Sequence, residues 1–277
     1  MKRVLIALLP PLAALMVVAT VALVVLREDD DPPPAAPAAS IEGEAQEAGA
    51  PRLAPESNVC QGILHRPEPG APPAFPAEYT QRREASGFII VGNADVAPEA
   101  MDEAAATVEH LFRNNDLEND LVAEGAYVIV ADAKQGVLDL PEFRCLDNTR
   151  NQDFYSHVCG VADRADYPVV TVNELDLLGN RRGPCGGLNI LYHELGHLVQ
   201  GWTLNQPDYF DIRQFFQDAR SAGKYAGDYA STNANEYFAE ATQAYFLSSD
   251  PAGKRDRDWL REYDPQIYEL LDGIYRD

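Results

Sequence analysis

Apolar residues in the middle of the chain fall into short runs that predict strands. Residues 87–92, 126–130 and 167–172 are rich in β-branched or aromatic side chains and are flanked by turn residues. Between the first two runs, residues 98–112 repeat apolar side chains at helical spacing after a proline that suits a first helical turn. Pro168 fits the third strand only at its start or at a sheet edge. A small sheet with at least one helix is therefore expected.

From about residue 188 the apolar pattern changes to a helical period. This pattern predicts four helices, at residues 188–203, 209–222, 233–247 and 265–275. Strands followed by a run of helices are typical of an α+β domain. We expect a small mixed sheet with helices, followed by a helical C-terminal half.

The N-terminal segment has the properties of a membrane helix. Residues 4–26 carry no charge, and as a helix they would extend about 34 Å, enough to cross a bilayer core of about 30 Å. Lys2 and Arg3 precede this run and acidic residues follow it at 28–31, so the remainder of the chain should be exported. Residues 1–26 are therefore expected to be a transmembrane anchor, with a cleaved signal peptide as the alternative.

The segment after this helix is expected to be a linker. Residues 27–58 are rich in Pro, Ala and Glu and cannot bury enough apolar surface to fold. The folded domain should therefore span residues 59–277, outside the cytoplasm as a membrane-anchored or secreted domain. The net charge of the chain is −22, which makes nucleic acid a poor partner.

Four cysteines indicate disulfides in an oxidising compartment. Three connectivities are possible, and no pair of cysteines has the spacing of a metal site. We expect Cys145 to pair with Cys159, because this bond closes a short loop, and Cys60 to pair with Cys185.

The main chemical motif is the sequence HELGH at residues 193–197. His193 and His197 lie one helical turn apart, so both imidazoles can reach one tetrahedral Zn²⁺. Glu194 does not lie on the helix face that the two histidines share, so it can take a proton from the zinc-bound water. Two surface or capping histidines on a helix are the alternative, but the flanking residues are apolar and place the segment in a core, where paired imidazoles need partners. Gln200 and Thr203 occupy the positions where metzincin peptidases carry glycine and a third histidine, which excludes that class.

A second acidic pair follows on a later predicted helix. Glu236 and Glu240 are also one helical turn apart, so one can bind zinc while the other orients a ligand imidazole. Asn233 and Glu236 also fit a helix cap with its partner. Two carboxylates on an otherwise apolar face would be costly without a cation, which favours the ligand interpretation.

These two blocks together resemble a known family. The HELGH motif and the sequence YASTNANEYFAEA at residues 229–241 are similar to the catalytic domain of anthrax lethal factor and the related Pro-Pro endopeptidases, within the gluzincin peptidases. The resemblance covers about residues 185–247 and implies a zincin-like fold. It implies that zinc is bound by His193, His197 and Glu236, that Glu194 is the general base, that Tyr229 donates to the oxyanion and that Glu240 supports the ligands.

The expected function is therefore hydrolysis of peptide bonds in a protein or peptide substrate. Residues 169–172 are expected to form an edge strand that pairs with the extended substrate. Tyr225 is a competing hydroxyl to Tyr229, one helical turn earlier. A zinc amidase acting on cell-wall peptides and a non-catalytic, anchored binding module with structural zinc are the alternatives. The sequence leaves open the identity of the substrate and the oligomeric state.

Overall fold

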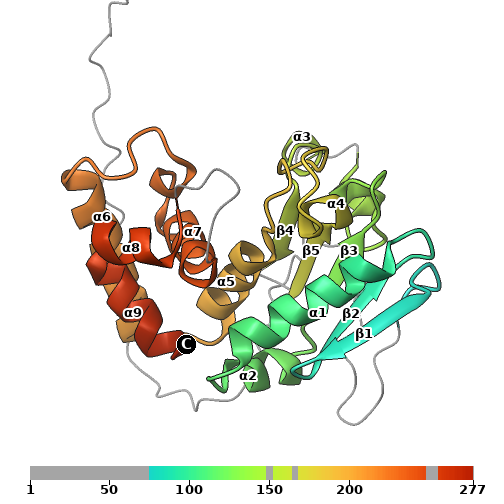
Figure 1. Ribbon diagram of the computed structural model, residues 1–277, viewed down its shortest axis with the longest axis horizontal. Helices are drawn as coiled ribbons and strands as arrows, with labels where there is room; N and C mark the ends of the chain where they lie inside the picture. The colour runs from blue at the N-terminus through green and yellow to red at the C-terminus, as the bar shows by residue number, and fades with distance from the viewer. Residues whose placement is uncertain (1–74, 148–151, 164–167, 248–254, 277) are drawn as a thin grey trace, which may run out of the picture. The chain divides into compact units, whose positions relative to one another are not determined.

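The computed structural model describes residues 75–147, 152–163, 168–247 and 255–276 (Figure 1). The expected anchor or signal peptide at residues 1–26, the expected linker at 27–58 and Cys60 lie outside these ranges. Within the described residues, no helix is both long enough and apolar enough to cross a membrane.

A five-stranded mixed sheet occupies one half of the fold, in the order β1-β2-β3-β5-β4. β2, β3 and β5 run parallel to one another, and each edge strand is antiparallel to its neighbour. The three interior strands confirm the three that the apolar runs predict, whereas neither edge strand was expected. The strands are β1 (Gln81–Ala85), β2 (Phe88–Gly92), β3 (Tyr127–Ala131), β4 (Gly160–Asp163) and β5 (Val169–Asn173).

The position of β5 corrects one expectation. Residues 169–172 were expected at a sheet edge, but β5 is paired on both sides, with β3 and with β4. Pro168 directly precedes β5, the other position that a proline permits. The edge of the sheet is instead β4, where Gly160 pairs with Val172.

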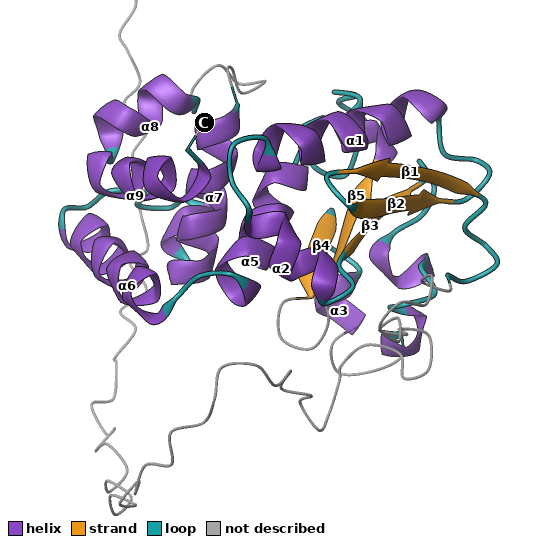
Figure 2. Ribbon diagram, turned by 90° about the horizontal axis from the view of Figure 1, so that it is seen from below, coloured by secondary structure: helices purple, strands orange, loops and turns teal. Residues whose placement is uncertain are grey.

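Both faces of the sheet are covered, so its interior strands read as continuous apolar runs. In β3, Val128 and Val130 join the core beneath the predicted helix α1 (Pro98–Phe112), which lies along one face (Figure 2). Tyr127 and Ile129 point to the opposite face. That face is covered by Val137, Leu140, Phe143 and Leu146. Short helices complete this half: α2 (Leu117–Ala123), α3 (Gln152–Tyr155) and α4 (Glu174–Leu177).

The other half is helical, and all four predicted helices are confirmed. Helix α5 packs against β4, β5 and α1 on one side and against α7 on the other (Figure 1). It begins later than expected, because the Asn189 side chain accepts the Leu191 N–H at 3.1 Å and so precedes the first helical residue. The helices are α5 (Leu191–Trp202), α6 (Gln206–Ser221), α7 (Ala234–Phe246), α9 (Pro265–Tyr275) and the unpredicted α8 (Arg257–Tyr263).

Gly196 allows α5 and α7 to approach closely. A Cβ atom at this position would lie 3.0–3.2 Å from side-chain atoms of Thr242. Almost any other residue would therefore force the helices apart. The glycine inside the HELGH motif thus helps to bring α7 up to the histidines.

The disulfide expectation is wrong. Cys159 is bonded to Cys185, with their Cα atoms 5.6 Å apart, so neither expected pairing forms. Cys159 directly precedes β4, and Cys185 lies in the loop that leads to α5, which packs against β4. Proximity in the fold, rather than a short loop in the sequence, determines this bond. Cys145 is also disulfide-bonded.

Candidate metal centre

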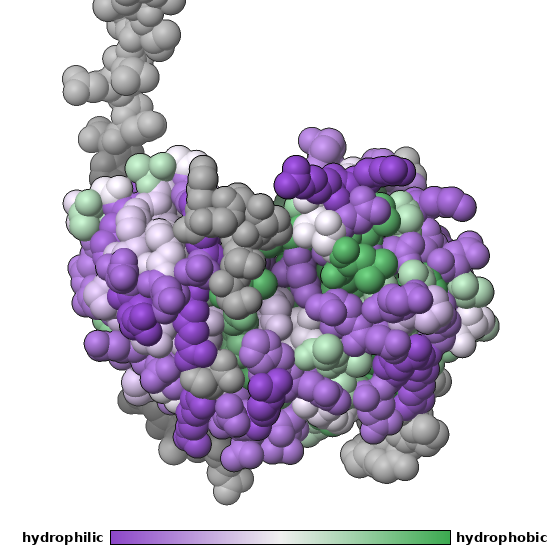
Figure 3. All heavy atoms as spheres, viewed as in Figure 1, coloured by the Kyte–Doolittle hydropathy of each residue, from purple (hydrophilic) through white to green (hydrophobic). Residues whose placement is uncertain are grey.

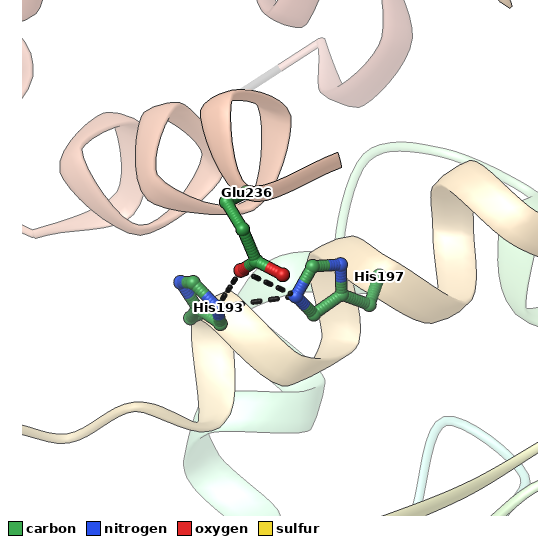
Figure 4. Close-up of side chains that lie close together, drawn as sticks. All are labelled: His193, His197 and Glu236. Carbon is green, nitrogen blue, oxygen red and sulfur yellow. Dashed lines mark hydrogen bonds and ion pairs between the residues drawn. The ribbon is translucent and has the colours of Figure 1, made fainter. Parts of the chain in front are cut away.

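Three side chains from two helices converge at the interface of α5 and α7. His193 and His197 project from α5, and Glu236 projects towards them from α7 (Figure 4). The two Nε2 atoms lie 3.2 Å apart. Glu236 Oε2 lies 3.3 Å from His193 Nε2 and 3.2 Å from His197 Nε2. All three side chains are buried.

This arrangement fits a zinc ion. A tetrahedral zinc with bonds of about 2.0–2.1 Å holds its ligand atoms about 3.4 Å apart, close to the three separations of 3.2–3.3 Å. Two imidazoles and one carboxylate form a common zinc donor set. Buried metal-binding atoms that face one another are unfavourable unless a cation or a shared proton lies between them. His193, His197 and Glu236 can therefore hold one metal ion.

The start of α7 orients Glu236. The Asn233 side chain accepts the N–H groups of Asn235 and Glu236 at 2.8 and 3.0 Å, so Asn233 is the helix cap. The Glu236 carboxylate lies against the histidines rather than folding back to the cap. Glu236 can therefore take part in the helix cap through its backbone N–H and also act as a metal ligand through its carboxylate.

A chain of charged groups lies behind His193. Glu240 Oε1 lies 3.2 Å from His193 Nδ1, on the side of the ring that faces away from Glu236. Arg255 contacts both Glu240, at 3.8 Å, and Asp228. Asp228 in turn caps the short 3₁₀ turn that carries Tyr229. Arg255 thus links two parts of the site, and no motif in the sequence marks it.

The cluster perturbs the protonation of its members. Burial alone would lower the pKa of His193, but hydrogen bonding to Glu236 and Glu240 outweighs it and raises the pKa to about 10. Burial alone would raise the pKa of Glu236, yet contacts with the two histidines hold it well below its usual range. Without metal, the carboxylate and a protonated imidazole therefore stabilise each other.

Glu194 lies between this cluster and the edge of the sheet. Its side chain is buried, and its carboxylate accepts the backbone N–H of Ala162 in β4. Burial raises the pKa of Glu194, although the two neighbouring histidines oppose the shift. A carboxylate in this position can exchange a proton with a group bound beside the metal ligands.

The two candidate tyrosine hydroxyls are in different environments. Tyr229 is 55% exposed, lines the cavity beside the cluster and has its ring centre 6.2 Å from that of His193. Tyr225 is buried among aromatic rings of the helical half, including Tyr237 and Trp259. Burial raises the pKa of Tyr225. Of the two, Tyr229 is the one positioned to meet a substrate.

A cavity of about 470 Å³ opens beside the metal cluster. Figure 3 shows the surface hollowed between the helical half and the sheet half, with apolar atoms beside the hollow on the sheet side. Gln243 lines the cavity from α7 and was not foreseen, although it lies two helical turns beyond Glu236 on the same face. Much of the remaining lining is apolar and comes from Phe154, Val158, Leu188, Ile190 and the disulfide between Cys159 and Cys185.

Comparison with protein families matches most of this chain to a known family. The family model described as anthrax toxin lethal factor, N- and C-terminal domain, matches residues 78–274. The matched region begins before β1 and ends within α9, so it covers the sheet half as well as the two helices that carry the cluster. Comparison with curated proteins gave no match.

Proposed function

This chain belongs to the anthrax toxin lethal factor family, and on that premise we propose that it is a zinc-dependent endopeptidase that acts outside the cytoplasm. Members of the family are zinc metallopeptidases, and the cluster of His193, His197 and Glu236 agrees with that chemistry. The observation that carries the proposal is the convergence of three metal-binding atoms beside a cavity that His193, the buried Glu194 and Tyr229 line.

Each side chain around the cavity has its own role in the proposed reaction. His193, His197 and Glu236 would hold zinc, which would supply a Lewis acid for the substrate carbonyl and would lower the pKa of water. Glu194 takes the proton of the attacking water and delivers it to the leaving amine. The Tyr229 hydroxyl donates a hydrogen bond to the carbonyl oxygen as negative charge develops there. Glu240 fixes the orientation of the His193 ring.

The outer edge of β4, which pairs with no other described strand than β5, is the proposed docking site for the substrate backbone. An extended peptide can add to an exposed sheet edge through main-chain hydrogen bonds. The Ala162 N–H on this edge is bonded to Glu194, and Gly160 lines the cavity. A peptide paired along β4 would therefore pass directly beside the proposed base.

The proposed location outside the cytoplasm rests on the disulfide and on the N-terminal sequence. A disulfide such as Cys159 to Cys185 is typical of secreted or extracytoplasmic proteins. The apolar, uncharged residues 4–26 agree with export, as an anchor or as a signal peptide.

The proposal predicts that Glu194→Gln abolishes hydrolysis while zinc stays bound. The amide has the size of the carboxylate but cannot accept a proton, so kcat should fall by about 10²–10⁴-fold. Cleavage of an unstructured protein gives the activity, and metal analysis of the same preparation gives the zinc content. Glu103→Gln, on the exposed face of α1, is the control and should behave as the wild type. Full activity in the Glu194 variant would overturn the assignment of the base.

The same measurements separate the alternatives. A binding module with structural zinc would bind the metal but cleave nothing, in the wild type as well as in the variant. A zinc amidase would release products from cell-wall fragments and leave the unstructured protein intact. The cavity beside the metal cluster argues for catalysis, because structural zinc sites are closed by protein ligands.

A further inference from the structure

Gln243 is a buried polar group on the wall of the cavity, which also carries apolar side chains. It is 6% exposed and lines the cavity from α7. Its neighbours on the cavity wall include Leu188, Ile190 and the disulfide between Cys159 and Cys185. A polar side chain in such surroundings is costly unless its hydrogen bonds are made.

The hydrogen-bonding capacity of Gln243 is not fully used within the described residues. Its Oε1 atom is buried and finds no partner there. The two carboxylates of the wall have partners: Glu194 accepts the Ala162 N–H, and Glu240 lies against His193. Gln200, on α5, also has a buried Oε1 without a partner in the described part of the chain, but it does not line the cavity. Gln243 is thus the residue of the cavity wall that carries an unused, buried hydrogen-bonding atom.

We propose that Gln243 selects the substrate residue that enters this cavity, favouring a side chain with a neutral amide over an apolar side chain of the same shape. This inference rests on the proposed peptidase function. The aliphatic part of such a side chain would contact the apolar wall, and its amide would exchange hydrogen bonds with the amide of Gln243. An apolar side chain would leave Gln243 unpaired, which is the strongest basis for rejecting an isostere.

Peptides that differ at one residue test this proposal in the zinc-loaded, full-length protein. The matched pairs are glutamine against methionine and asparagine against leucine, placed in turn at each position on both sides of the cleaved bond. At one position, kcat/KM should be at least about tenfold higher for the amide member of a pair. In Gln243→Met, the ratio should fall to about one or reverse, with zinc content unchanged. Gln200→Met is the matched control and should keep the wild-type ratio.

A binding measurement gives a readout that does not depend on turnover. Calorimetric titration of the same peptides into the Glu194→Gln variant should show the amide preference as a ratio of Kd values. The double variant with Gln243→Met should lose that preference. Equal binding and cleavage of both members at every position of the wild type would overturn the inference, as would an amide preference that survives in Gln243→Met.

Failure of this inference is distinct from failure of the proposed function. Cleavage of peptides without any amide preference contradicts the role of Gln243 and leaves the peptidase assignment intact. If the wild type cleaves no peptide, the peptidase assignment fails, and the inference that rests on it fails as well.

Discussion

Two buried carboxylates, one in each half of the fold, have chemically different partners: hydroxyl groups in one case and imidazole rings in the other. Glu142, beside the sheet, is 0% exposed and accepts the hydroxyls of Tyr79 and Tyr127 at 2.5 and 2.6 Å. Glu236, on α7, faces the Nε2 atoms of His193 and His197. Burial raises the pKa of Glu142, and the tyrosine hydroxyls oppose this only in part. For Glu236 the histidines outweigh burial and lower the pKa.

The difference separates a packing feature from a candidate metal site. Hydroxyl groups satisfy the lone pairs of Glu142 without compensating its charge, and within the described residues Glu142 belongs to no group of three side chains that could hold a metal ion. Imidazoles and a carboxylate present three converging donor atoms, which a metal ion can bridge. Burial alone therefore does not indicate function, whereas the chemical type of the facing groups does.

The largest expected effect is the loss of zinc when the charge of Glu236 is removed. Glu236→Gln should weaken zinc binding by more than about 100-fold. Loss of a residue that only orients a ligand costs up to about 100-fold in metal affinity, and loss of a ligand itself should cost more. Glu142→Gln is the matched control, since it also removes a buried carboxylate, and it should leave the zinc Kd unchanged. Competition with a chromogenic chelator measures both values. Equal zinc affinities in the two variants would contradict the distinction between Glu236 as a metal ligand and Glu142 as a packing residue.

The next effect concerns the close approach of α7 to α5, which brings Glu236 to the histidines. Gly196→Ala places a methyl group against Thr242 and should lower the free energy of unfolding by about 1–3 kcal/mol. Gly273→Ala in α9 meets no atom within 4 Å and should raise it by about 0.5–1 kcal/mol. Urea denaturation of the metal-free variants measures both. Equal stabilities would show that the helices can separate without cost.

Most of the fold was predictable because its elements carry full apolar patterns. The bounds of α1 and α9 match the prediction, since each begins at a proline and keeps its helical spacing throughout. The edge strands lack such patterns: β1 reads QRREA, and β4 has only four residues. Helix α8 is short and depends on its Asp256 cap.

The sequence pattern did not predict the edge strand β4. This omission explains the two wrong predictions near the site, which concern the position of β5 and the disulfide pairing. Without β4, β5 appears to be the edge of the sheet, and Cys159 has no reason to lie near Cys185. The two histidines were predictable because their spacing lies within one helix, whereas the choice of Glu236 rather than Glu240 as a ligand followed from the resemblance to the lethal factor family. Arg255 and the cavity wall come from segments that only the tertiary fold brings together.

The smallest expected effect is a pH dependence of stability that comes from Glu142. Because burial raises its pKa in the folded protein, the folded state binds more protons than the unfolded state between the two pKa values. The free energy of unfolding should therefore fall as pH rises through that window, and Glu142→Gln should remove this contribution. In urea denaturation at several pH values, the variant should resemble the wild type at acid pH and become relatively more stable as pH rises.

The exposed Glu103→Gln provides the control for this pH series and should follow the wild type throughout. A constant difference between Glu142→Gln and the wild type would mean that the hydroxyls of Tyr79 and Tyr127 fully compensate the buried charge. In that case the two carboxylates would differ in their partners but not in the cost of their charge. A difference that grows with pH would instead establish that charge compensation, present at Glu236 and absent at Glu142, is what distinguishes the candidate metal site from the packing site.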